Sequence, residues 1–160
     1  MPKRTAAVVA ALALVVTGAA LAATSGTLVN LHSTSLGKVL ASSKGDTLYL
    51  LTADPKNKSV CKGSCAQTWP PLLTKGKPRA GKGVKASLLN EIKRGTKEQV
   101  TYNGHPLYLY IGDSGPGQVS GEGIKSFGGT WYALNAAGKK VAKTSGGGGG
   151  TTTSPYTNPY

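Results

Sequence analysis

The sequence predicts a mainly β protein in which two tandem hairpin-based repeats form one compact antiparallel β domain, with short helical turns in loops. The first observation is a ten-residue pattern that occurs twice along the chain. The second is a succession of short apolar runs broken by glycine-containing turns. The third is the composition, because 160 residues with 39% hydrophobic and 16% charged residues suit one modest domain.

The first residues indicate export. Two cations precede an apolar run over 6–16 and an Ala-x-Ala site that ends at Ala22. This order is typical of a signal peptide over residues 1–22, and the apolar run is too short to span a bilayer. We expect a secreted or extracytoplasmic chain with no transmembrane segment, soluble after signal-peptide cleavage. Residues 23–33 are expected to form a linker or an edge strand.

The repeated pattern is Gly-x-x-Leu-Tyr-Leu-x-x-x-Asp, found over 45–54 and again, without a gap, over 104–113. A Trp follows each copy, which predicts two repeats at about 36–73 and about 86–143. In the second copy, two leucines and Ile111 alternate with tyrosines, so both faces of the strand are apolar. Such strands are covered on both sides, and the two copies should pair as central strands of a shared core.

Turn residues predict three hairpins. Asn103-Gly104 suits the positive φ angles of a two-residue hairpin turn between residues 100–102 and 106–111. The other two hairpins are expected to join 39–41 to 47–52 and 131–134 to 140–142.

The remaining segments link or follow the repeats. Residues 86–94 fit either a helical stripe or a strand that turns at Gly95-Thr96, and we favour the strand. The Gly-, Lys- and Pro-rich stretch over 74–85 should be a flexible connector. The folded domain is expected to span 34–143. Five consecutive glycines and a polar end then predict a disordered tail over 144–160.

Longer motifs give a resemblance. The motif Tyr-x-aromatic-x-x-Asp occurs at Tyr108, Tyr110 and Asp113, and in the first copy Leu51 stands at its second aromatic position. Together with the Cys-x-x-x-Cys to Trp-Pro-Pro-Leu run that ends at residue 72, it resembles the bacterial secreted-repeat family of predicted lipoproteins, whose function is unknown. The resemblance implies an extracytoplasmic protein with tandem β-rich repeats, and it implies no activity, cofactor or catalytic residue. The lipobox Cys of lipoprotein members is absent.

Two cysteines, Cys61 and Cys65, lie four positions apart in a chain bound for an oxidising compartment. We interpret them as a structural disulfide. The alternative is a redox or copper-handling protein in which Cys61, Cys65 and His105 are the ligands. No metal or cofactor is expected under the favoured interpretation, and no covalent haem motif is present.

Several motif residues are interpreted as structural positions with binding as the alternative. Each Asp should cap its own turn or accept a hydrogen bond from a Tyr of its own strand. The tryptophans should pack in the core, with an exposed stacking platform as the alternative. His105 is interpreted as a turn residue. The sequence contains no recognised nucleophile motif, so we do not expect an enzyme. The positions concerned are Tyr49, Asp54, Trp69, His105, Tyr108, Tyr110, Asp113 and Trp131.

Charge is the remaining signal. Removal of residues 1–22 leaves 17 basic residues against 6 acidic ones, a net charge of +11. This excess predicts a cationic surface on a non-enzymatic binding or structural module of the cell envelope or extracellular space. The expected partners are anionic envelope polymers or headgroups, such as teichoic acids, acidic glycans or anionic lipids. Nucleic acid is not expected outside the cell, and no nucleic-acid motif is present.

Overall fold

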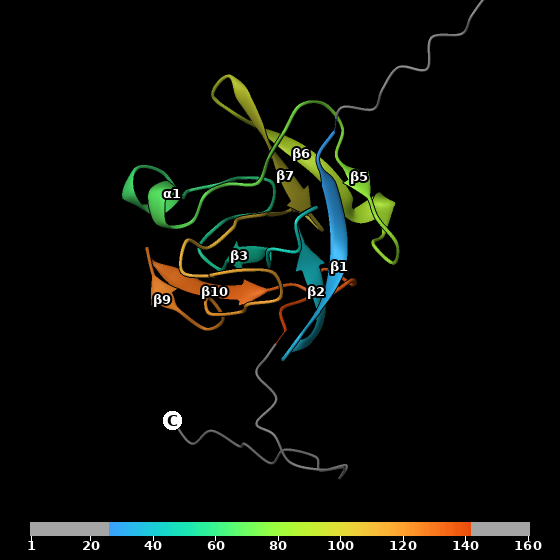
Figure 1. Cartoon of the computed structure of the whole chain (residues 1–160). Helices are drawn as coiled ribbons and strands as arrows, with labels where there is room; N and C mark the ends of the chain where they lie inside the picture. The colour runs from blue at the N-terminus through green and yellow to red at the C-terminus, as the bar shows by residue number, and fades with distance from the viewer. Residues whose placement is uncertain (1–25, 142–160) are drawn as a thin grey trace, which may run out of the picture.

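A computed structural model describes residues 26–141 and shows the predicted mainly β architecture (Figure 1). The predicted signal peptide and the predicted tail over 144–160 lie outside the described residues. Within residues 26–141 no helix is long and apolar enough to cross a membrane.

Three small sheets make up the structure. In the first sheet β1 lies between β2 and β5, in the second β10 lies between β3 and β9, and in the third β7 lies between β4 and β6 and also pairs with β8. The strands are β1 (Leu28–Thr34), β2 (Gly37–Ala41), β3 (Tyr49–Leu51), β4 (Leu73–Thr74), β5 (Arg79–Ala80), β6 (Leu89–Arg94), β7 (Lys97–Tyr102), β8 (His105–Pro106), β9 (Lys125–Ser126) and β10 (Gly129–Ala133). The helical turns are α1 (Ser64–Thr68) and a 3-10 turn (Ala86–Leu88).

An antiparallel hairpin stands at the start of each repeat, β1–β2 and β6–β7, and β1 lies before the predicted start of repeat 1 at about residue 36. The two turns correspond, because Thr34 pairs with Gly37 just as Arg94 pairs with Lys97. After the hairpin the chain turns back along its second strand in both repeats. The amide of Leu48 donates to the carbonyl of Leu40 at 2.9 Å, and Asn103 and Gly104 have the expected positive φ angles, 51° and 75°.

The two Leu-Tyr-Leu segments (residues 48–50 and 107–109) pair with each other, as predicted. The amide of Tyr49 donates to the carbonyl of Tyr108 at 2.9 Å, and the reverse bond is 3.0 Å long. This antiparallel pair joins the two repeats at their equivalent tyrosines. The two repeats are therefore related by an approximate two-fold axis that passes through the centre of the molecule.

The repeats also exchange strands. We call residues 69–72 and 131–134 the Trp strands. The Trp strand of repeat 2 pairs with β3 of repeat 1, where Trp131 lies opposite Leu51. The Trp strand of repeat 1 lies along the second Leu-Tyr-Leu segment, where the amide of Leu109 donates to the carbonyl of Pro70 at 2.8 Å. Each repeat is thus completed by the Trp strand of the other.

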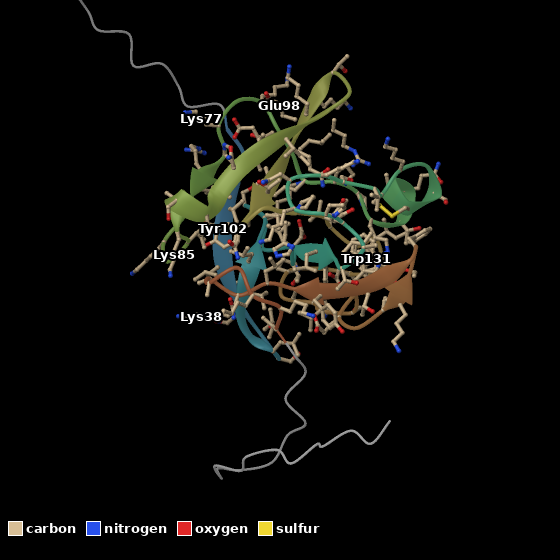
Figure 2. All side chains as sticks on the ribbon, turned by 180° about the vertical axis from the view of Figure 1, so that it is seen from behind. Lys38, Lys77, Lys85, Glu98, Tyr102 and Trp131 are labelled. Atoms are coloured by element: carbon tan, nitrogen blue, oxygen red, sulfur yellow. A yellow bond between two sulfur atoms is a disulfide. The ribbon has the colours of Figure 1, made fainter. Side chains whose placement is uncertain are left out.

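The core has two parts. One part contains mainly aliphatic side chains, including Leu48, Leu50 and Leu107, and the other contains the aromatic side chains and the two cysteines. Figure 2 shows Trp131 among the side chains over β10. One predicted core residue is wrong, because Ile111 is 66% exposed. The chain has already left the strand at that position and entered a turn.

Two predictions for the flanking segments are corrected. The edge strand predicted within 23–33 is an inner strand, because β1 extends to Thr34 and pairs with β2 on one side and β5 on the other. The 74–85 connector is not a simple flexible link. It contains β5, which runs parallel to β1, and Val84 joins the aliphatic core. The favoured strand over 86–94 is present as β6, preceded by the 3-10 turn.

Candidate functional site

Two crossed Tyr–Asp hydrogen bonds connect the repeats at the centre of the molecule. The Tyr108 hydroxyl donates to Oδ2 of Asp54 at 2.6 Å, and the Tyr49 hydroxyl donates to Oδ2 of Asp113 at 2.8 Å. The expected bond within one strand is therefore wrong, because each Tyr reaches the Asp of the other repeat. These crossed bonds connect the repeats through side chains where the Leu-Tyr-Leu segments connect them through the backbone.

Both carboxylates also hold the loop that follows them. Oδ1 of Asp54 accepts from the amide of Val60 at 2.7 Å, and Oδ1 of Asp113 accepts from the amide of Ser120 at 2.8 Å. These bonds reach six and seven residues along the chain, so they are not the predicted Asx turns; each Asp instead holds the longer loop that follows it. Both oxygens of each Asp are engaged within the protein.

Electrostatics keep the tyrosines protonated. Burial raises the pKa of both the Tyr49 and Tyr108 hydroxyls well above the usual value, and the partner carboxylate raises each further. Burial also raises the pKa of Asp54, while hydrogen bonds from Tyr108 and Val60 oppose that shift. These groups act as fixed donors and acceptors that stabilise the fold.

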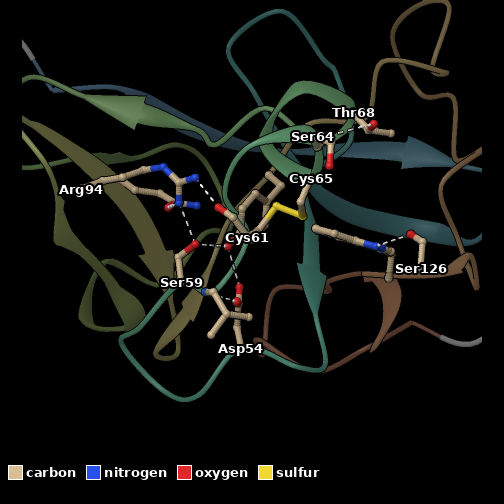
Figure 3. Close-up of a disulfide and its surroundings, with 12 residues drawn as sticks. Asp54, Ser59, Cys61, Ser64, Cys65, Thr68, Arg94 and Ser126 are labelled. Atoms are coloured by element: carbon tan, nitrogen blue, oxygen red, sulfur yellow. Dashed lines mark hydrogen bonds between the residues drawn. A yellow bond between two sulfur atoms is a disulfide. The ribbon is translucent and has the colours of Figure 1, made fainter. Parts of the chain in front are cut away.

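Arg94 at the end of β6 fastens the loop that carries the first cysteine (Figure 3). Its guanidinium donates to Oγ of Ser59 at 2.6 Å, to Oε1 of Gln99 at 3.1 Å and to the carbonyl of Cys61. The Ser59 hydroxyl in turn lies 2.7 Å from the Tyr108 hydroxyl. Repeat 2 therefore holds the cysteine loop of repeat 1 through side chains.

The two cysteines form the predicted disulfide, and both are buried. The alternative ligand set of Cys61, Cys65 and His105 requires thiolates, which an oxidised pair does not supply. Among residues 26–141 no three His, Cys, Asp or Glu side chains come together in a way that could hold a metal ion. The arrangement gives no support to the copper alternative.

The tryptophans pack in the core, as the favoured interpretation predicted. Trp69 and Trp131 are fully buried and stack on each other. Their ring centroids lie 3.9 Å apart, and the angle between the ring planes is 2°. Tyr110 stacks on Trp69 at 4.2 Å. Since both indoles are enclosed, the alternative of an exposed Trp platform is wrong.

His105 lies at a groove of about 600 Å³, which we call the His105 groove. Thr52, Asp54 and Lys140 also line it. Burial lowers the pKa of His105, and the neighbouring charges of Lys56 and Lys140 lower it further. The structure does not bring His105 and Asp113 together, because Asp113 lines a different groove with Tyr110.

The charged side chains are distributed unequally between surface and interior. Residues 26–141 contain 16 Lys and Arg residues, of which all but the half-buried Arg94 are exposed, and no Asp or Glu in this part of the chain is exposed. Asp54 and Glu122 are buried, and the other four carboxylates are half-buried. In Figure 2 the exposed Lys38, Lys77 and Lys85 lie along one side of the molecule. Sequence reasoning missed Arg94 and this burial of acids.

Comparison with protein families gives a match to a secreted repeat of unknown function over residues 31–73 and again over 92–135. Curated proteins and solved structures give no match. The two matched ranges cover more than half of the chain and contain both crossed Tyr–Asp pairs and the disulfide. The chain therefore belongs to this family of secreted repeats.

Proposed function

We propose that this protein is a secreted, non-enzymatic binding module of the cell envelope or extracellular space, and that its exposed lysines bind anionic polymers. The observation that carries the proposal is the separation of charge in residues 26–141, where almost every cation is exposed and no carboxylate is. A surface of this kind attracts polyanions and has few neighbouring acids to neutralise it.

One groove lined by lysines lies between the connector and the β6–β7 hairpin. Its volume is about 790 Å³, and Lys75, Lys93 and Lys97 lie around an apolar wall that includes Leu73. Glu98, its one acidic residue, accepts a hydrogen bond from the amide of Gly76 at 3.3 Å. We call this the connector groove, and we propose it as the main contact for a flexible polyanion.

The test is binding of the mature protein to immobilised poly(glycerol phosphate), with dextran as the neutral control polymer. Raising the salt from about 0.1 M to about 1 M shortens the Debye length from about 10 Å to about 3 Å. We expect retention on the polyanion at the lower salt, release at the higher salt and no retention on dextran. Equal retention on both polymers, or none on either, would exclude the proposal.

Matched variants test the location. The triple variant Lys75→Gln, Lys93→Gln and Lys97→Gln removes three charges from the connector groove. A control triple variant at Lys58, Lys62 and Lys125 removes three exposed charges elsewhere. The first triple should lower polyanion affinity more than the second, and an equal effect would exclude the connector groove as the main contact.

A further inference from the structure

The His105 groove is a second concave site, separate from the connector groove. Its lining comes from repeat 1 and from two separate segments of repeat 2, and it includes Thr52, Asn103, His105, Lys139 and Lys140. Hydroxyl, amide, imidazole and ammonium groups thus meet at one hollow of about 600 Å³. All of these groups can donate a hydrogen bond to an anion.

Two cations at or beside this groove are held in place: Lys140 lines it, whereas Lys56 is not a lining residue and lies next to the lining residue Asn103. The ammonium of Lys140 lies over the ring of Tyr132, 4.8 Å from its centroid. The ammonium of Lys56 donates to the carbonyl of Asn103, which is two residues from His105. A positioned ammonium loses less side-chain entropy when an anion binds than a freely moving surface lysine does. These contacts therefore prepare the groove for a negative group.

The groove has little negative charge of its own. Asp54 is the one carboxylate that lines it, and both of its oxygens are engaged, by Tyr108 and by the amide of Val60. Burial lowers the pKa of His105, and the positive charges of Lys56 and Lys140 lower it further. A bound anion would offset the positive charge of these ammonium groups.

The approximate two-fold relation supplies a natural comparison. In the repeat alignment, His105 corresponds to Asp46 and Asp54 corresponds to Asp113. The corresponding groove, of about 220 Å³, is lined by both of these acids and by Tyr110, and no Lys, Arg or His lines it. The two equivalent grooves therefore differ in the sign of the charge that their side chains carry. Repeat architecture alone explains a hollow at each place, but it does not explain cations at one of them only.

We propose that the His105 groove binds a phosphate group of an anionic envelope polymer. The donors suit phosphate oxygens, and the ammonium groups of Lys139 and Lys140, which line the groove, can pair with the charge of a phosphodiester in the polymer chain or of a phosphate monoester at its end. A hollow lined by side chains from three segments fits a chain or an end group better than a flat bilayer surface. The polymer source rests on the proposed function above, whereas the phosphate site itself does not.

The test uses the full mature chain, labelled for NMR and titrated with inorganic phosphate. We expect saturable shifts of His105, Gly138 and Lys140 that exceed those at residues around the connector groove. The double variant Lys56→Gln and Lys140→Gln should raise the dissociation constant about tenfold, the equivalent of about 1.4 kcal/mol. A control double variant at Lys58 and Lys62 removes the same charge elsewhere and should change it less than about twofold.

The outcomes separate the claims. Phosphate shifts spread over the whole lysine surface, or equal weakening by both double variants, would overturn the site. If the phosphate site is present but the wild-type protein does not bind poly(glycerol phosphate), the proposed function fails and the site stands. Binding to vesicles of phosphatidylcholine with phosphatidylglycerol, lost in the Lys56/Lys140 variant while poly(glycerol phosphate) shows no such dependence, would overturn the polymer source in favour of a membrane.

Discussion

The crossed Tyr–Asp bonds can be tested by removing one hydroxyl group. The substitution Tyr108→Phe deletes the donor that lies 2.6 Å from Oδ2 of Asp54, a carboxylate only 8% exposed. Hydrogen bonds to charged groups contribute about 1.5–3 kcal/mol, so we expect a loss of about 2 kcal/mol in the free energy of unfolding. The equivalent substitution Tyr49→Phe should cost about 1 kcal/mol, because Asp113 is only half-buried and water can replace the hydroxyl.

Double-mutant cycles measured by urea unfolding then decide which Asp belongs to which Tyr. Tyr108→Phe combined with Asp54→Asn should show a coupling of about 1–3 kcal/mol. The same Tyr substitution combined with Asp113→Asn, the Asp of its own repeat, should be additive within about 0.5 kcal/mol. A coupling of Tyr108 to Asp113, or none to Asp54, would show that the crossed arrangement described here is wrong.

Three further predictions concern packing, pH and the disulfide. A Cβ at Gly121 would lie 2.8 Å from a ring carbon of Trp69, so Gly121→Ala should cost about 1–3 kcal/mol by overpacking, measured as a fall in the urea midpoint. The fold lowers the pKa of His105 below 6.5, so the contribution of this residue to the free energy of unfolding is present above pH 6.5 and is lost as the pH falls through the pKa of the folded state. The substitution His105→Gln should flatten this part of the plot of unfolding free energy against pH, and an unchanged plot would contradict the reasoning. Joint replacement of Cys61 and Cys65 by Ala should cost about 2 kcal/mol from loop closure alone, and an unfolding midpoint equal to that of the wild type would contradict a stabilising disulfide.

Local signals predicted local structure well. Asn103-Gly104 identified its hairpin turn, since few other residues accept two consecutive positive φ angles. The apolar character of both faces of the repeated segments predicted central strands, and Leu107 and Tyr108 are fully buried. Cys61 and Cys65 were paired correctly because the chain has no other cysteine.

Contacts between the two repeats could not be predicted from local sequence signals. Two equivalent copies give two equivalent partners for every residue, so the sequence does not say which Trp strand completes which repeat. One error was avoidable. Tyr108 and Asp113 are five residues apart, about 16 Å along an extended strand, which exceeds the reach of a Tyr side chain. A bond within one strand was therefore excluded by length alone.

The site residues show the same limit. Arg94 is one of 19 basic residues, and nothing in its immediate sequence separates it from the exposed cations. The positive character of the His105 groove comes from Lys139 and Lys140, which line it, and from Lys56 nearby. All three are distant from His105 in the sequence and come near it only in the folded chain. The exposure of the lysines followed from the composition, but the burial of the acids did not.

The exchange of Trp strands changes what a single repeat unit can be in evolution. A chain that carried one such unit would leave its hairpin open and its own Trp strand without a place, so it would have to associate with a second chain to satisfy both. Fusion of two units into one polypeptide removes the dependence on concentration. It also lets the halves differ, and here one hollow is lined by His105, Lys139 and Lys140 while its counterpart is lined by Asp46 and Asp113.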